Sequence, residues 1–114
     1  MSLLRFLSLC NLLIFGTIFT KAVNMRLRSE VWEQEVSIEN FKFVPDVVKI
    51  KPGQSVIWTN NTKILHNVVF DLANKSSYLK RGESYLKIFK EKGVYKYYCE
   101  PHRAMGMAGT VIVE

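Results

Sequence analysis

A short segment near the C-terminus contains three side chains that can bind a metal ion. Cys99, His102 and Met107 offer a thiolate, an imidazole and a thioether within nine consecutive residues. Because Cys99 and His102 are three residues apart, one tight turn can bring both to a single ion. The only other histidine of the chain, His66, lies far upstream at the start of an apolar segment. These residues predict a metal site that joins two distant parts of the chain.

The mixture of donor atoms favours copper. Soft sulfur ligands suit Cu(I) and imidazole suits Cu(II), and two histidines and a cysteine with a weak axial methionine form the ligand set of blue-copper electron-transfer sites. We therefore predict one type 1 copper ion, with the ligands His66, Cys99, His102 and Met107. Zinc is a weaker alternative, because methionine is a poor zinc ligand.

Short apolar segments separated by turn residues predict an all-β fold. The expected strands cover residues 36–43, 47–51, 55–59, 67–70, 85–89, 94–99 and 109–113. Turn signals such as Pro52-Gly53 and Lys92-Gly93 lie between them. In the sixth segment Tyr95, Tyr97 and Cys99 share one face, so Cys99 is expected to point inward. The pattern predicts an antiparallel Greek-key β-sandwich of about seven to eight strands.

The chain is expected to contain one folded domain after a leader. Residues 1–22 carry an early Arg5, then an apolar run, and end at Ala22, which is typical of a secretory signal peptide. The apolar run is shorter than the roughly 20 residues of a spanning helix, so cleavage is favoured over a membrane tether. Residues 23–35 are expected to form a tether or an edge strand, and residues 36–114 the domain.

A cleaved leader places the protein in the periplasm or another exported compartment, and an uncleaved one would tether it to the membrane. Cleavage would remove Cys10 and leave Cys99 as the single cysteine, which cannot form an internal disulfide. A lone thiol in an oxidising compartment is protected when it binds a metal. The cysteine count thus agrees with the predicted metal site.

The two ligand-bearing segments resemble those of the cupredoxins, the blue-copper family, and within it pseudoazurin, plastocyanin and amicyanin. Residues 66–70, His-Asn-Val-Val-Phe, are similar to the upstream ligand segment of this family. Residues 99–102, Cys-Glu-Pro-His, followed by Met107, are similar to its C-terminal ligand loop. The resemblance spans about residues 36–114 and implies a cupredoxin-like fold.

The resemblance also implies a role for each residue of the site. His66, Cys99 and His102 would be the equatorial ligands and Met107 the axial ligand. Asn67 would brace the ligand loop through hydrogen bonds. Met105 lies three residues after His102, the spacing that amicyanin uses for its axial ligand, so Met105 remains an alternative to Met107.

The residues predict an electron carrier rather than an enzyme. A copper oxidase or reductase needs a second metal centre with further histidines, and the chain has none beyond His66 and His102. We expect Cu(I)/Cu(II) cycling to move one electron between exported redox proteins. The alternative is a periplasmic copper carrier or chaperone without redox turnover.

The redox donor and acceptor are expected to dock near the exposed edge of His102, on an apolar patch of Pro101, Ala104 and Met105. The chain also contains a basic run that comprises Lys80, Arg81, Lys87, Lys90, Lys92 and Lys96. We expect this run to steer an acidic partner. The alternative is that it forms a solvated sheet edge whose charges discourage strand pairing. Nucleic-acid binding is not expected despite the net charge of +6, because export and a metal site explain the chain better. We expect a monomer.

Overall fold

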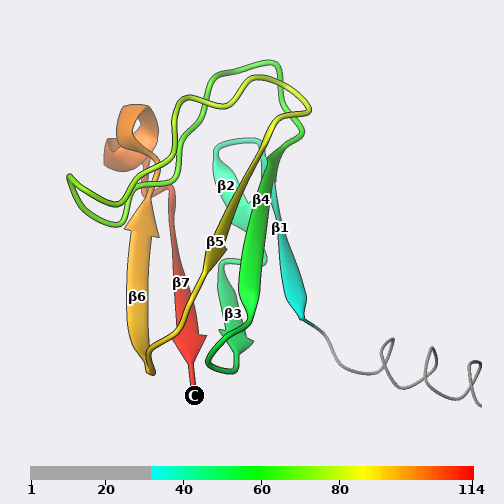
Figure 1. Ribbon diagram of the computed structural model, residues 1–114. Coiled ribbons are helices and arrows are strands. Elements are labelled where there is room, and N and C mark those ends of the chain that lie inside the picture. Colours follow the sequence, from blue (N-terminus) through cyan, green and yellow to red (C-terminus); the bar gives the residue numbers. More distant parts are fainter. Residues whose placement is uncertain (1–31) are drawn as a thin grey trace, which may run out of the picture. The chain divides into compact units, whose positions relative to one another are not determined.

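The structure is a computed structural model that describes residues 32–114. In this range the chain forms seven strands and one short 3₁₀ helix (Figure 1). In order they are β1 (Glu33–Glu39), β2 (Lys42–Val44), β3 (Val47–Ile50), β4 (Ser55–Asn60), β5 (Ser84–Ile88), β6 (Gly93–Tyr98), η1 (Glu100–Met105) and β7 (Ala108–Val113). The predicted signal peptide lies outside the described residues. The described residues 32–114 contain no candidate for a membrane-spanning helix.

The strands form two sheets, with the orders β2-β1-β4-β5 and β3-β7-β6 (Figure 1). This confirms the predicted all-β sandwich, and the connections between the sheets are consistent with a Greek key. The pairing is mixed rather than purely antiparallel, because β1 is parallel to β4 and β3 is parallel to β7. No hairpin joins either parallel pair, because the chain passes through the other sheet before it returns. After such a long connection the returning strand can pair either parallel or antiparallel to the first.

Two expected strands differ in the structure. The single strand predicted over residues 36–43 is divided into β1 and β2 by a turn at Asn40 and Phe41, and β1 already begins at Glu33. The strand predicted over residues 67–70 is not formed. Val69 instead makes isolated bridges to two different segments. The segment divides its backbone hydrogen bonds between Lys75 on one side and Tyr98 on the other. Neither pairing continues over enough residues to form a strand.

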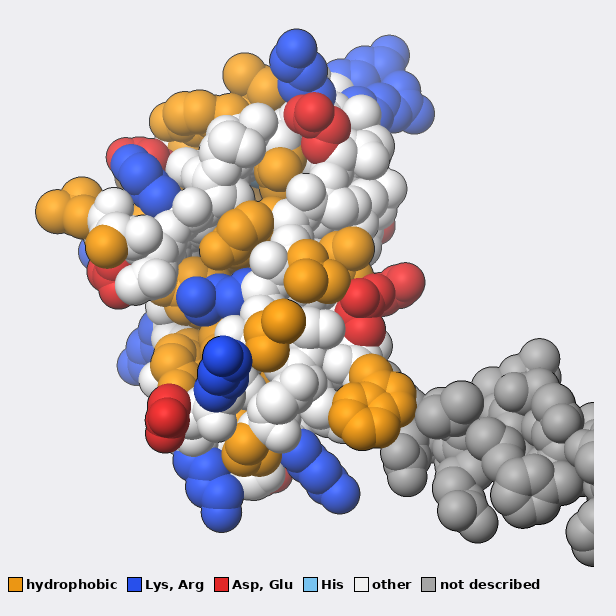
Figure 2. Space-filling model, viewed as in Figure 1, with side chains coloured by type: hydrophobic (Ala, Val, Ile, Leu, Met, Phe, Trp, Pro, Cys, Tyr) orange, Lys and Arg blue, Asp and Glu red, His pale blue; other side chains and the backbone are white. Residues whose placement is uncertain are grey.

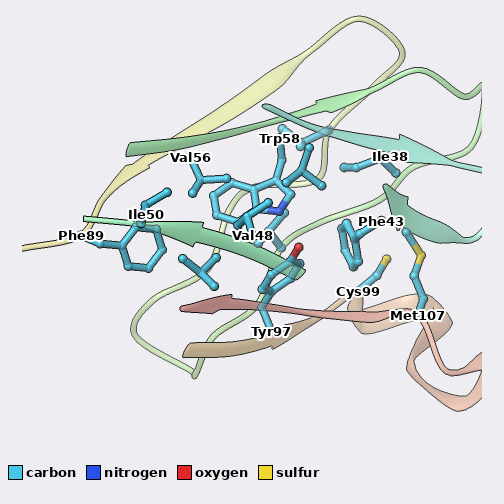
Figure 3. Close-up of a cluster of buried hydrophobic side chains, with 14 of the residues drawn as sticks. Ile38, Phe43, Val48, Ile50, Val56, Trp58, Phe89, Tyr97, Cys99 and Met107 are labelled. Atoms are coloured by element: carbon cyan, nitrogen blue, oxygen red, sulfur yellow. The ribbon is translucent and has the colours of Figure 1, made fainter. Parts of the chain in front are cut away.

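Alternating side chains fill the space between the sheets. In β4 the buried positions are Val56, Trp58 and Asn60, every second residue, as expected for a strand with one face in the core. Figure 3 shows Trp58 and Tyr97 within this cluster of buried side chains, with Cys99 towards one end of it. The predicted inward orientation of Cys99 is confirmed, since its exposed fraction is 0%.

Tyr97 on β6 folds over Gly109, its partner on β7. The phenol ring is held between Phe43 and Trp58, at centroid distances of 4.8 and 5.3 Å. Burial raises the pKa of Tyr97 to about 12. A Cβ atom on residue 109 would overlap the phenol oxygen and the adjacent ring carbon. Glycine is therefore required at this position by the close approach of the ring.

We expect Gly109→Ala to lower the free energy of unfolding by about 1–3 kcal/mol, the range for overpacking a core. The measurement is urea denaturation of the metal-free protein. Tyr97→Leu provides the matched background, because leucine lacks the distal ring atoms that the new methyl group would meet. The cost of Gly109→Ala should be clearly smaller there, and an equal cost in both backgrounds would contradict this explanation.

Candidate metal centre

Three of the predicted ligands meet at one end of the sandwich. His66, Cys99 and His102 offer ligand atoms that all lie within 4.8 Å of one another. The Nδ1 atom of His66 is 3.6 Å from the sulfur of Cys99, and the Nδ1 atom of His102 is 3.4 Å from it. A metal ion typically lies about 2.0 Å from an imidazole nitrogen and about 2.3 Å from a thiolate sulfur. With a tetrahedral angle at the ion, the nitrogen and the sulfur are then about 3.5 Å apart. The residues therefore fit one small metal ion.

Of the two methionines in the ligand loop, Met107 is the buried one. Its exposed fraction is 1%, whereas that of Met105 is 62%. The carbonyl oxygen of Met107 accepts a hydrogen bond of 3.0 Å from the backbone N–H of Cys99. Figure 3 shows the Met107 and Cys99 side chains at the same end of the core. Met107 thus offers its thioether on the inner side of the loop, and Met105 lies at the surface.

The ligand loop is shaped by η1, which begins directly after Cys99. Pro101 lies in its first turn, where a missing N–H and a fixed φ are tolerated. The loop ends at Gly106, whose φ of 78° is left-handed and favours glycine. Backbone hydrogen bonds from His102 to Cys99 and from Met107 to His102, of 3.2 and 3.4 Å, close the loop. Proline at the start and glycine at the end thereby bring three donor residues back to one place.

His66 is delivered by a segment that the side chain of Asn60 organises. Asn60 is the last residue of β4 and is fully buried. Its Nδ2 donates to the carbonyl oxygens of Ile64 and Leu79, both at 2.8 Å, and its Oδ1 accepts from the Thr62 backbone at 2.9 Å. His66 in turn forms an isolated bridge with Leu79. The sequence analysis did not identify this positioning role of Asn60.

Asn67 connects the two ligand-bearing segments. Its Oδ1 accepts a hydrogen bond of 2.8 Å from the backbone of Glu100, and its Nδ2 donates to the Glu100 carboxylate at 3.2 Å. Because Asn67 follows His66 and Glu100 follows Cys99, these bonds hold neighbouring ligands together. They are of the kind expected for a bracing residue. Glu100 as the partner was not foreseen, although its place beside Cys99 could have suggested it.

Burial sets the protonation of the two inner ligands. Desolvation, with a smaller contribution from nearby His102, lowers the pKa of His66, which favours a neutral imidazole with a free lone pair. Desolvation also raises the pKa of the Cys99 thiol, although backbone hydrogen bonds oppose this. A metal ion must therefore displace the thiol proton, so its binding weakens as the pH falls.

Phe41 packs against both histidines and was missed by the sequence analysis. Its ring centroid lies 4.9 Å from that of His102 and 6.1 Å from that of His66. A sequence signal for the turn that carries it does exist: the apolar positions are even-numbered at Val36 and Ile38, but odd-numbered at Phe41 and Phe43. A change of parity marks a break in strand alternation.

The residues of the predicted docking patch lie at the surface around His102. Pro101, Ala104 and Met105 are exposed members of η1, and His102 between them is half-buried. The imidazole of His102 therefore connects the buried ligands with the exterior.

The predicted basic run does not form one patch. Lys80 and Arg81 precede β5, whose first residue pairs with Thr59 at the end of the sandwich where Asn60 holds the ligand segment. Lys90 and Lys92 lie between the end of β5 and the start of β6, at the opposite end. Figure 2 shows Lys and Arg side chains at both ends of one face.

Lys87 differs from the other cations of the run, because its side chain covers part of the core. Its Nζ atom lies 5.5 Å from the ring centroid of Phe70 and 5.7 Å from that of Phe89. An ammonium group this close to aromatic rings is attracted to their faces. Lys87 thus contributes to packing as well as to charge.

Known proteins are similar to this chain both in sequence and in fold. The profile of the family described as copper binding proteins, plastocyanin/azurin family, matches residues 31–114. The chain is 44% identical over 84 residues to the chloroplastic plastocyanin of Tetradesmus obliquus, covering 63% of this chain and 58% of that protein. It is 39% identical over 84 residues to the plastocyanin of Scenedesmus fuscus, covering 63% and 86%.

A solved structure of amicyanin from Paracoccus versutus superposes with a TM-score of 0.66 at 34% identity, covering 72% of this chain and 81% of that one. The cupredoxin resemblance and the predicted copper cofactor are thereby confirmed. Because the family profile matches well over half of the chain, this protein belongs to the plastocyanin/azurin family of copper-binding proteins.

Proposed function

We propose that the protein is a one-electron carrier whose copper ion is held by His66, Cys99, His102 and Met107. The observation that carries this proposal is the convergence of two imidazole Nδ1 atoms on one buried sulfur, at 3.4 and 3.6 Å. Copper supplies the one-electron redox chemistry, because this donor set accepts both of its oxidation states. Zinc would leave the thioether of Met107 without a use.

The chain contributes by fixing the ligands in place. The Asn67–Glu100 hydrogen bonds and the bridge between His66 and Leu79 hold the two ligand segments through contacts of the chain itself. Ligands that are held in this way move little when the charge of the site changes by one. Small rearrangement favours rapid electron transfer and distinguishes a carrier from a copper chaperone, which must release its ion.

A redox donor and acceptor are proposed to dock over the half-buried edge of His102. The exposed apolar residues Pro101, Ala104 and Met105 belong to the same short helix and suit a small interface that forms and separates quickly. We propose no enzymatic activity, because both histidines of the chain are used at this one centre. We also propose that the protein is a monomer and has no nucleic-acid partner.

Export is proposed from the leader-like residues 1–22, with cleavage near Ala22 releasing the domain into the periplasm or an equivalent compartment. Retention of the leader as a membrane tether is the alternative.

The primary test is the visible absorption spectrum of the purified protein after addition of Cu(II). We expect an intense blue band from the Cys99 thiolate that ascorbate bleaches and reoxidation restores. Cys99→Ser should abolish the band while the β-rich circular dichroism spectrum is kept. Absence of a band with a free Cys99 thiol would overturn the proposal, and a site that binds Cu(I) without reversible oxidation would favour the copper carrier.

Met107→Leu is expected to keep the copper and raise the reduction potential, because a lost axial thioether weakens Cu(II) binding more than Cu(I) binding. Each tenfold change in their relative affinity corresponds to about 59 mV for one electron. Met105→Leu is the matched control and should leave the potential unchanged in cyclic voltammetry, since Met105 is exposed. The reverse result would assign the axial position to Met105.

Steering is tested with ferricyanide, a small anionic oxidant, in stopped-flow experiments on the reduced protein. Neutralising Lys80 and Arg81 to Gln should slow oxidation severalfold at low salt, because both lie at the metal end. The matched pair Lys90→Gln and Lys92→Gln changes the net charge equally at the opposite end and should have a smaller effect. The difference should disappear in about 1 M salt, where screening acts within about 3 Å. Equal effects of both pairs would contradict steering and favour the alternative, in which the basic run is only a solvated sheet edge.

A further inference from the structure

Phe41 and the two histidines form one cluster of three rings at the metal end. The planes of Phe41 and His102 meet at 69°, and those of Phe41 and His66 at 72°, both edge-to-face arrangements. The two imidazoles are themselves 4.8 Å apart, centroid to centroid. Edge-to-face contacts of this kind are favourable and depend on orientation, so they can define the angle of a neighbouring ring.

The backbone of Phe41 is unusual. With a φ of 58°, it is the one non-glycine residue within 32–114 that has a positive φ. The left-handed region is unfavourable for an aromatic residue and natural for glycine or asparagine. Asn40, the other residue of this two-residue turn, has no positive φ. A phenylalanine at the strained position is therefore not explained by the turn, and its ring contacts are the feature that accounts for it.

The turn is firmly attached on both sides. β1 and β2 pair antiparallel up to Glu39 and Lys42, which flank the turn directly. Phe43, two residues further, is buried against Tyr97 at a centroid distance of 4.8 Å. The Phe41 ring thus projects from a fixed hairpin end and can act as a rigid support.

The two histidines differ in how much support they have without Phe41. His66 is fully buried, and backbone hydrogen bonds to Leu79 hold it in both directions. His102 is half-buried in the short η1, where its own φ and ψ of −119° and 17° are not helical. His102 is the ligand whose ring orientation depends on a neighbour.

We propose that Phe41 is a positioning residue that holds the His102 ring with its Nδ1 towards Cys99 and keeps water from one face of that ring. This inference rests on the proposed copper site, but the ring packing lies within the chain itself, so its effect on His102 is tested on the metal-free protein as well. A support of this kind should slow metal loss and lower the polarity around the ligand, which controls the potential of a metal site.

The test compares Phe41→Gly, Phe41→Tyr and Asn40→Ala with the unmodified protein. Phe41→Gly removes the ring and relieves the backbone strain, so the fold is expected to be kept. Phe41→Tyr keeps the ring and is the conservative control. Asn40→Ala changes the same turn without touching the histidines.

In NMR spectra of the metal-free proteins, Phe41→Gly should shift and average the His102 ring signals, whereas the other two variants should not. With Zn²⁺ as a redox-silent probe and excess chelator, Phe41→Gly should lose the metal about two- to tenfold faster, the range that aromatic pair energies imply. With copper, its reduction potential should fall, since water at His102 favours the more highly charged Cu(II).

Unchanged His102 signals and unchanged Zn²⁺ loss in Phe41→Gly would overturn the inference. So would equal losses in Phe41→Gly and Phe41→Tyr, because the turn rather than the ring would then be responsible. If the unmodified protein forms no blue copper site, the proposed function fails, but the NMR comparison still decides whether Phe41 orients His102.

Discussion

The metal centre depends on the pairing of Val69 with Tyr98. The backbone N–H of Val69 donates to the carbonyl oxygen of Tyr98 at 2.9 Å, and that of Tyr98 donates back at 3.1 Å. This bridge brings the residues before Val69 alongside those after Tyr98, so that His66 meets Cys99 although 33 positions separate them. Because hydrogen bonds fix both distance and direction, the backbone itself determines how these two residues lie relative to each other.

The aromatic core keeps this bridge in position. Tyr97, next to the bridge, packs against Trp58 and Phe70, with both ring centroids at 5.3 Å. Close-packed interiors resist small displacements, so the two ligand segments cannot separate without disturbing the sandwich. The proposed electron carrier requires such a rigid support, because its ligands must suit two oxidation states in one arrangement.

The ligands could be predicted from the sequence because their chemistry is visible in the residue types. Cys99 and His102 are neighbours in a turn that Pro101 favours, and His66 is the only other histidine. The sequence left Met105 as an alternative to Met107, and the structure adds that Met107 is the buried one of the two. Asn60, Phe41 and the parallel strand pairs could not be predicted, because their roles arise from contacts between segments that are distant in sequence.

Burial also prepares the site for a cation and determines where electrons can pass. With the pKa of His66 lowered and that of Cys99 raised, the interior disfavours charge on either ligand alone. A metal cation and a thiolate would compensate each other's charge there. His66 and Cys99 are enclosed, and His102 is the half-buried member of the three, which is why the proposed redox partners are placed at its edge.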